Sequence, residues 1–316
     1  MEKTSHFSDK YHRPYLMGVS IIIVFLFHIW SFALRYHNVE IPIMGSFFGC
    51  GYFGVDIFFF LSTYGLSYSI NNNTLKQFYK NRFSRIIPAY IVFLIFFCIC
   101  FSVFYKNNWL VVIGYFLSSI SGLAVINEFP QVEWYTPSLI LIYAFFPIIN
   151  AISKWLANKN CLVISLLLIG LHVVLYHTSL PIYSNFYQRI PIIFLGCIYF
   201  YLERKNENCG IYVLSLLGLF GSCFAYGCID RVAIAIPAIL YIIGKCNTLP
   251  FYKAISYCGK WSFEIYLAQV VSTKYFMKIY NGNILLEVVC VILITIALSF
   301  VFSSVTHYYK VLMKSK

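Results

Sequence analysis

Long apolar stretches recur along the whole of this chain, and they restrict the folds that it can adopt. The clear ones cover 15–34, 48–70, 86–105, 136–153, 161–177, 190–202, 211–229, 232–246, 258–279 and 284–306. Several of them reach the ~20 residues that an α-helix needs to cross about 30 Å of hydrocarbon. Because they are continuously apolar and do not alternate with polar residues, they predict transmembrane helices and not a membrane β-barrel.

The composition also indicates an integral membrane protein. Only 11% of the 316 residues are charged and 60% are hydrophobic, whereas roughly 25% of the residues in an ordinary globular protein are charged. The net charge of +12 does not indicate a nucleic-acid partner, because the basic residues are scattered between the apolar runs. The 11 cysteines are dispersed without metal-binding spacing, so we expect no metal site.

Positive charge predicts the side of the membrane on which each loop lies. The most basic loop, from Lys76 to Arg85, is expected in the cytoplasm. If the weaker stretch 109–127 does not span, four further basic segments fall on that side; if it spans, most later Lys and Arg move outside. We therefore predict an all-α, polytopic transmembrane helix bundle with about ten spans and both termini cytoplasmic. Residues 1–316 then form a single integral-membrane domain, with 109–127 on the outer side.

One strongly ionisable side chain, His28, interrupts the first apolar run, in the outer half of that span. A titratable group is costly inside a bilayer and is treated as functional by default. A neutral imidazole there could accept a proton from a hydroxyl group as a general base. The alternative is a histidine that hydrogen-bonds a neighbouring helix, and spacing alone does not separate the two.

Asp56 lies among aromatic residues at the start of the second run, so its carboxylate must be paired or protonated. It could orient His28 or the glycine-rich turn before it, or it could cap the free N–H groups of its helix. Arg82 and Arg85 are three residues apart and share a helix face. Two guanidinium groups there could bind a phosphate or pyrophosphate, although composition alone favours anchoring to lipid headgroups.

Four further residues are less specific. Trp134 and Arg189 lie near the predicted outer interface, where an aromatic belt and snorkelling account for them equally well. Glu264 is an acid in an apolar run that also contains Tyr266, and it could instead lie in the inner interface. None of the four identifies a chemistry by itself.

Taken in order, these segments resemble the acyltransferase 3 family of membrane acyltransferases. Each motif is weak alone, but the ordered set covers nearly the whole chain. The matching segments are Met17-Gly18 followed by His28, residues 54–62, residues 82–88, Trp134 with Tyr143 and Pro147, Arg189-Ile190-Pro191 with Gly196, and residues 262–267.

The resemblance implies a ten-helix membrane domain that transfers an acyl group, usually acetyl from cytoplasmic acetyl-CoA, to sugar hydroxyls of surface polysaccharides. It implies no tightly bound cofactor, acyl-CoA as co-substrate, a glycan acceptor, and a multi-pass location in the plasma or inner membrane. The resemblance assigns His28 as the catalytic histidine, and Arg82 and Arg85 as the Arg-x-x-Arg element near the donor side. We expect Asp56 to assist catalysis and Trp134, Arg189, Glu264 and Tyr266 to bind the acceptor or support the site.

The chain departs from the family pattern at two positions. The family often has Arg eleven residues before the histidine, where this chain has Met17; Arg13, one turn earlier, is a candidate substitute. The family also often has His after the Tyr-Leu motif, where this chain has Gln269, whose amide can hydrogen-bond but cannot shuttle a proton. Both changes leave open an acyl group other than acetyl.

The predicted topology suggests how such a transfer would proceed. Residues 13 to 28 cover ~22 Å of helix, so His28 lies far from the cytoplasmic arginines and near the side where a polysaccharide could reach it. His28 would activate the sugar hydroxyl directly or would first accept the acyl group. The rival classes are a transporter or flippase for an acyl donor or lipid-linked sugar, and a membrane polymerase or glycosyltransferase. The first predicts mid-membrane acids and repeated halves, whereas the apolar runs of this sequence hold few acids and show no visible repeat.

Overall fold

A computed structural model describes residues 12–37, 51, 53–105, 109–126, 133–180, 182, 184–205, 248–276 and 283–314. Every regular element in these residues is helical, which confirms the all-α class. Among the residues that the structure describes, five helices are long and apolar enough to cross a membrane: His12–Ser31, Phe53–Asn72, Leu75–Cys100, Tyr135–Leu156 and Ile284–Met313. Helices suit this role because each satisfies its own backbone hydrogen bonds in a solvent that offers none.

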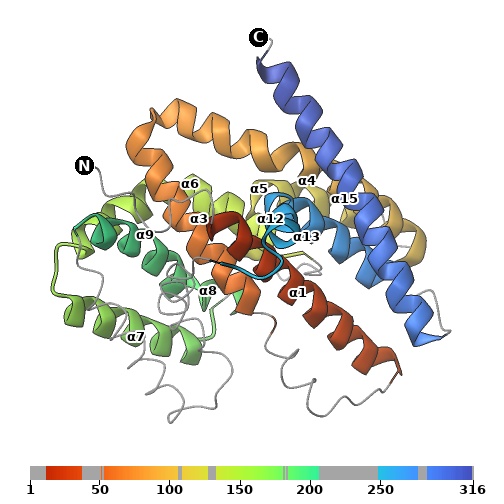
Figure 1. Cartoon of the computed structure of the whole chain (residues 1–316), viewed down its shortest axis with the longest axis horizontal. Helices are drawn as coiled ribbons and strands as arrows, with labels where there is room; N and C mark the ends of the chain where they lie inside the picture. The colour runs from red at the N-terminus through yellow and green to blue at the C-terminus, as the bar shows by residue number, and fades with distance from the viewer. Residues whose placement is uncertain are drawn as a thin grey trace.

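The helices form a row that other helices cross (Figure 1). In the row, each helix contacts the next in the order α15, α13, α1, α3, α9 and α7, with α12 also against α1. Helices α4 and α6 pack across the row, and α5 packs against α4 and α6. The bounds are α1 His12–His37, α3 Phe53–Asn72, α4 Leu75–Tyr105, α5 Trp109–Ser121, η2 Leu123–Val125, α6 Tyr135–Leu156, α7 Cys161–His177, α8 Ser184–Tyr187, α9 Ile190–Arg204, α12 Tyr252–Lys260, α13 Ser262–Val271, η4 Ser272–Phe276 and α15 Ile284–Lys314.

The predicted number of spans is matched only in part by these helices. Helix α5 has 13 residues and is too short to cross a bilayer, in line with the non-spanning assignment of 109–127. Helices α7 and α9 have 17 and 15 residues, shorter than the ~20 of a typical span. The predicted spans 211–229 and 232–246 lie outside the described residues. Ten spans and cytoplasmic termini therefore stay predictions.

One predicted span is wrong as a single helix. The apolar run 258–279 is divided, because α12 ends at Lys260, α13 begins at Ser262, and Trp261 between them is not helical (φ −109°, ψ 19°). Helix α12 carries a lysine near each end, and a glycine, a weak helix former, precedes its last residue. These polar and flexible residues explain why the helix ends at this point. Helix α12 packs on α1, whereas α13 packs mainly on α15.

Glycines bring α1 into backbone contact with both of its main neighbours. A Cβ atom at Gly18 would overlap the carbonyl group of Ile255 on α12, and a Cβ at Gly259 would overlap the carbonyl of Pro14 on α1. On the other side, a Cβ at Gly54 of α3 would lie 2.5 Å from the Ser20 carbonyl oxygen. Small residues allow such close helix packing in membranes, and here they fix the position of α1.

This contact gives the first prediction. The Gly18→Ala variant must push α1 away from α12, and we expect it to lower the free energy of unfolding by about 1–3 kcal/mol, as other overpacked interiors do. Gly170→Ala is the matched control, because nothing lies within 4 Å of a Cβ built there. Thermal unfolding of the purified protein in detergent checks both variants. An unchanged midpoint for Gly18→Ala would contradict the proposed packing.

Candidate functional site

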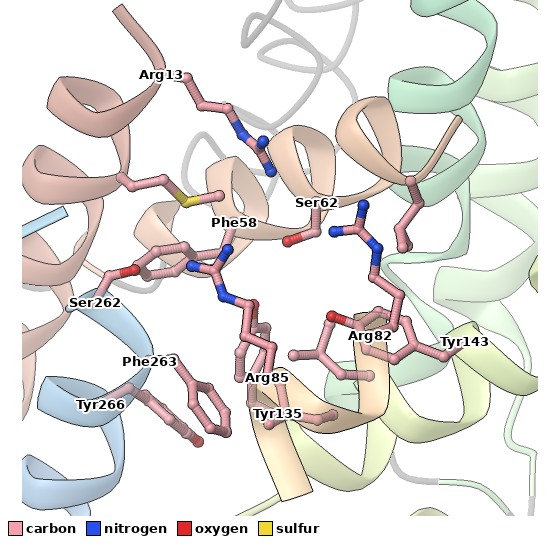
Figure 2. A pocket seen from close by; sticks show the side chains of 14 residues that line it. Arg13, Phe58, Ser62, Arg82, Arg85, Tyr135, Tyr143, Ser262, Phe263 and Tyr266 are labelled. Atoms are coloured by element: carbon pink, nitrogen blue, oxygen red, sulfur yellow. The ribbon is translucent and has the colours of Figure 1, made fainter. Parts of the chain in front are cut away.

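Three arginine side chains meet in one pocket. Arg13 enters from α1, and Arg82 and Arg85 enter from the start of α4. Figure 2 shows the three guanidinium groups directed at the stretch of α3 that carries Phe58 and Ser62. The cavity measures about 60 Å³, and we call it the arginine pocket; it is lined by Arg13, Met17, Phe58, Ser62, Leu66, Arg82, Arg85, Ile86, Tyr135, Leu139, Tyr143, Ser262, Phe263 and Tyr266.

The charge balance of the arginine pocket favours an anionic ligand. None of the described residues that line it is acidic, and three like charges at close range repel one another. Glu264 lies on the neighbouring α13, almost fully buried, and interacts electrostatically with Arg85 without lining the cavity. Planar guanidinium groups bind phosphate and carboxylate oxygens bidentately. A phosphate or a similar anion is therefore the ligand that this lining fits.

A glycine on α3 accommodates Arg13. A Cβ atom at Gly65 would lie 2.6 Å from Nη2 of Arg13, so the guanidinium occupies the space that a larger residue would fill. Met17, one turn further along α1, lines the same cavity. Arg13 and Met17 thus contribute to the same cavity.

A second charged cluster lies at the first turn of α3. Arg189 Nε and Asp56 Oδ1 are 2.6 Å apart in a mostly buried ion pair. The Arg189 guanidinium also stacks over the ring of Trp134, 5.3 Å from its centre, a favourable cation–π arrangement. Asp56 and Gly65 are nine residues apart on α3, so the ion pair lies about 13.5 Å along the helix from the point where Arg13 contacts α3.

His28 lies beyond both clusters along α1. Gly54 of α3 packs against Ser20 and Val24 of α1, whereas Gly51 packs against Ile23 and Phe27, so His28 is level with Gly51, before the start of α3. Its Nδ1 atom is buried and makes no hydrogen bond with the described residues. The charge of Lys274, on the π-helical turn η4, acts on the His28 ring. The structure pairs Asp56 with Arg189, and a role for Asp56 in orienting His28 stays a prediction.

One buried acid, Glu133, which the sequence did not predict as a site residue, joins several elements. Glu133 is 1% exposed, and its carboxylate accepts hydrogen bonds from the Thr136 backbone N–H (2.7 Å), the Tyr266 hydroxyl (3.0 Å) and the Tyr90 hydroxyl (3.1 Å). Burial raises the pKa of the Glu133 carboxyl, and these hydrogen bonds oppose that rise. In the sequence, Glu133 directly precedes an apolar run, a position where an acid can cap a helix. That position is the sequence signal that could have identified it.

Comparison with known families decides the class of the protein. A family model described as an acyltransferase domain matches residues 15–304. The chain belongs to the acyltransferase 3 family. No curated protein and no solved structure matches it. The arginine pocket and His28 are therefore features of a membrane acyltransferase, built on the apolar helices described above.

The acyltransferase chain divides its predicted site residues among separate places. Arg82, Arg85 and Tyr266 line one cavity, Asp56, Arg189 and Trp134 form the second cluster, and His28 and Glu264 belong to neither. The sequence did not identify Tyr135, Tyr143 and Glu133 as site residues. Within the described residues, no three His, Cys, Asp or Glu side chains gather as ligands for a metal.

The ion pair at the second cluster gives the next prediction. Asp56→Ala leaves the Arg189 guanidinium without its carboxylate, and we expect it to destabilise the protein by about 3–5 kcal/mol, as for other broken buried pairs. The double variant Asp56→Ala/Arg189→Ala removes both charges and should lose less than the sum of the two single variants. A thermal-unfolding double-mutant cycle measures the difference. Additive losses would show that the two groups do not interact.

Proposed function

We propose that this membrane acyltransferase moves an acyl group, most simply acetyl, from cytoplasmic acyl-CoA to a sugar hydroxyl of a cell-surface polysaccharide. The observation that carries the proposal is the convergence of Arg13, Arg82 and Arg85 on one cavity without a lining acid, in a chain of an acyltransferase family. An acyl donor with phosphate groups supplies the anion that such a cavity fits.

The donor enters, in this proposal, from the side of the arginines. Positive residues concentrate on cytoplasmic loops, and Lys76, Lys80, Arg82 and Arg85 all lie in the first turns of α4. The cavity of about 60 Å³ accommodates a phosphate-sized group, not a whole coenzyme. The phosphates are held at the arginines while the thioester arm extends along the bundle toward His28.

His28 acts on the acceptor in this proposal. Its imidazole takes the proton of the sugar hydroxyl, the hydroxyl oxygen forms a bond to the thioester carbonyl carbon, and the carbon–sulfur bond breaks. The proton then passes to the departing sulfur, so that free CoA thiol and an O-acyl sugar result. In the alternative with an acyl-histidine intermediate, an imidazole nitrogen first bonds the thioester carbonyl carbon, the carbon–sulfur bond breaks, and the sulfur takes the imidazole proton to leave as CoA thiol. The sugar hydroxyl oxygen then bonds the same carbon as the nitrogen–carbon bond breaks, and the hydroxyl proton returns to the imidazole. The buried Nδ1 atom without a hydrogen bond supports a ring that is free to take up a proton.

The donor assignment predicts a loss of affinity at the arginines. Replacing Arg82 or Arg85 by Ala removes a charge-assisted phosphate contact of about 1.5–3 kcal/mol, which corresponds to an affinity for CoA that is about 10- to 100-fold lower. Lys76→Ala is the control, because it removes an exposed positive charge from the same helix. Calorimetric titration of CoA into the detergent-solubilised protein measures each affinity. Equal effects of the arginine variants and Lys76→Ala would contradict the assignment.

The acceptor assignment predicts that His28→Ala abolishes surface acylation. A general base contributes roughly 100- to 10,000-fold to a rate, so O-acyl signals in the NMR spectrum of the purified surface glycan should disappear. His177→Ala, which removes an exposed imidazole from the end of α7, should leave these signals unchanged. If the signals persist in His28→Ala while the protein is present at the wild-type level, His28 is not the catalytic group.

A further inference from the structure

Glu133 connects three separate segments through one carboxylate. It precedes α6 and accepts a backbone hydrogen bond from Thr136 in the first turn of that helix. It accepts a second bond from Tyr90 on α4 and a third from Tyr266 on α13. A buried carboxylate is tolerated when donors satisfy its oxygens, so these three bonds hold the segments together at a defined point.

The same segments form most of the arginine pocket. Helix α4 contributes Arg82 and Arg85, α6 contributes Tyr135 and Tyr143, and α13 contributes Tyr266, together with other lining residues. Arg85 precedes Tyr90 by five residues, or about 7.5 Å of helix. Glu133 therefore lies just past the pocket, at the point where its supporting helices meet, and does not line it.

The bond to Glu133 determines how Tyr266 faces the pocket. Figure 2 shows the Tyr266 hydroxyl directed away from the three guanidinium groups, so the ring and not the hydroxyl forms the wall. The ring meets the Tyr135 ring edge to face, with centroids 5.1 Å apart, a favourable aromatic geometry. A carboxylate that fixes the Tyr266 hydroxyl therefore also fixes the two-ring wall made by Tyr266 and Tyr135.

We propose that Glu133 is a positioning residue that holds the Tyr266–Tyr135 wall and thereby controls access to the pocket arginines. The part of this inference that concerns the donor rests on the proposed function. Tyr90 bonds the same carboxylate but does not line the cavity, so it shares the structural role of Glu133 without the positioning role. This difference between the two tyrosines makes the inference testable.

The first experiment compares Tyr266→Phe and Glu133→Gln with the matched control Tyr90→Phe in the full chain. Both tyrosine variants remove one buried hydroxyl from the same carboxylate, so a purely structural effect is alike in both. We expect Tyr266→Phe and Glu133→Gln to weaken CoA binding about tenfold in calorimetric titration, equivalent to about 1.4 kcal/mol. Tyr90→Phe should bind CoA within about twofold of the wild type, a difference of under 0.5 kcal/mol by the same relation.

A second readout needs no donor. Phenylglyoxal modifies exposed guanidinium groups, and mass spectrometry of the digested protein gives the rate at Arg85, with the exposed Arg204 as internal reference. The rate at Arg85 relative to Arg204 should rise in Tyr266→Phe and Glu133→Gln and stay at the wild-type value in Tyr90→Phe. When the Tyr266–Tyr135 wall loses the hydrogen bond that holds it, Arg85 becomes more accessible to the reagent, whereas the exposure of Arg204 does not change.

The two readouts separate failure of the inference from failure of the proposed function. If the wild-type protein binds CoA and all three variants match it, or if Tyr90→Phe weakens binding as much as Tyr266→Phe, the positioning role is overturned. If the wild-type protein does not bind CoA, the donor assignment fails, and the Arg85 modification rates alone decide the inference. Unchanged rates in Tyr266→Phe and Glu133→Gln overturn it in that case as well.

Discussion

The close contact of α1 with its neighbours determines where the charged groups of this protein can meet. Glycines at positions 18, 54 and 259 let the α1 backbone touch α12 on one side and α3 on the other. In lipid, helices gain little from burying apolar surface against each other, so tight packing through small residues is a main source of association. Because α1 carries Arg13, Met17 and His28, this packing fixes both the arginine pocket and the level of the histidine.

The charged residues lie at different positions along the helix axes. Arg13 lies against Gly65, while Asp56 and Arg189 pair about 13.5 Å further along α3, and His28 lies further still along α1. Buried charges are stable in such a bundle only where a partner, a ligand or a set of donors compensates them. Arg189 pairs with Asp56, and three donors hydrogen-bond Glu133. The arginine pocket fits an anionic ligand that would neutralise its positive charge.

Sequence patterns that depend on local spacing predicted part of this arrangement. The apolar runs gave the helical class, and the three-residue spacing of Arg82 and Arg85 predicted a shared face, which the pocket confirms. The break at Trp261 was missed because average hydropathy does not register a short polar helix beside an apolar one. The pairing of Asp56 with Arg189 and the bonds of Glu133 join residues distant in the chain, so they follow from the order of helix packing and not from any local period.

The proposed function requires that an acyl group pass covalently from a donor held at the arginines to an acceptor near His28. A transporter or flippase would form no such bond. The most direct measurement uses the purified protein in vesicles with acetyl-CoA enclosed and the glycan acceptor supplied outside. The account predicts release of free CoA thiol inside that depends on the outer acceptor, is matched by O-acetyl groups on that acceptor, and is lost in His28→Ala. Acceptor that stays unmodified, with no thiol released while the protein binds CoA, would contradict it.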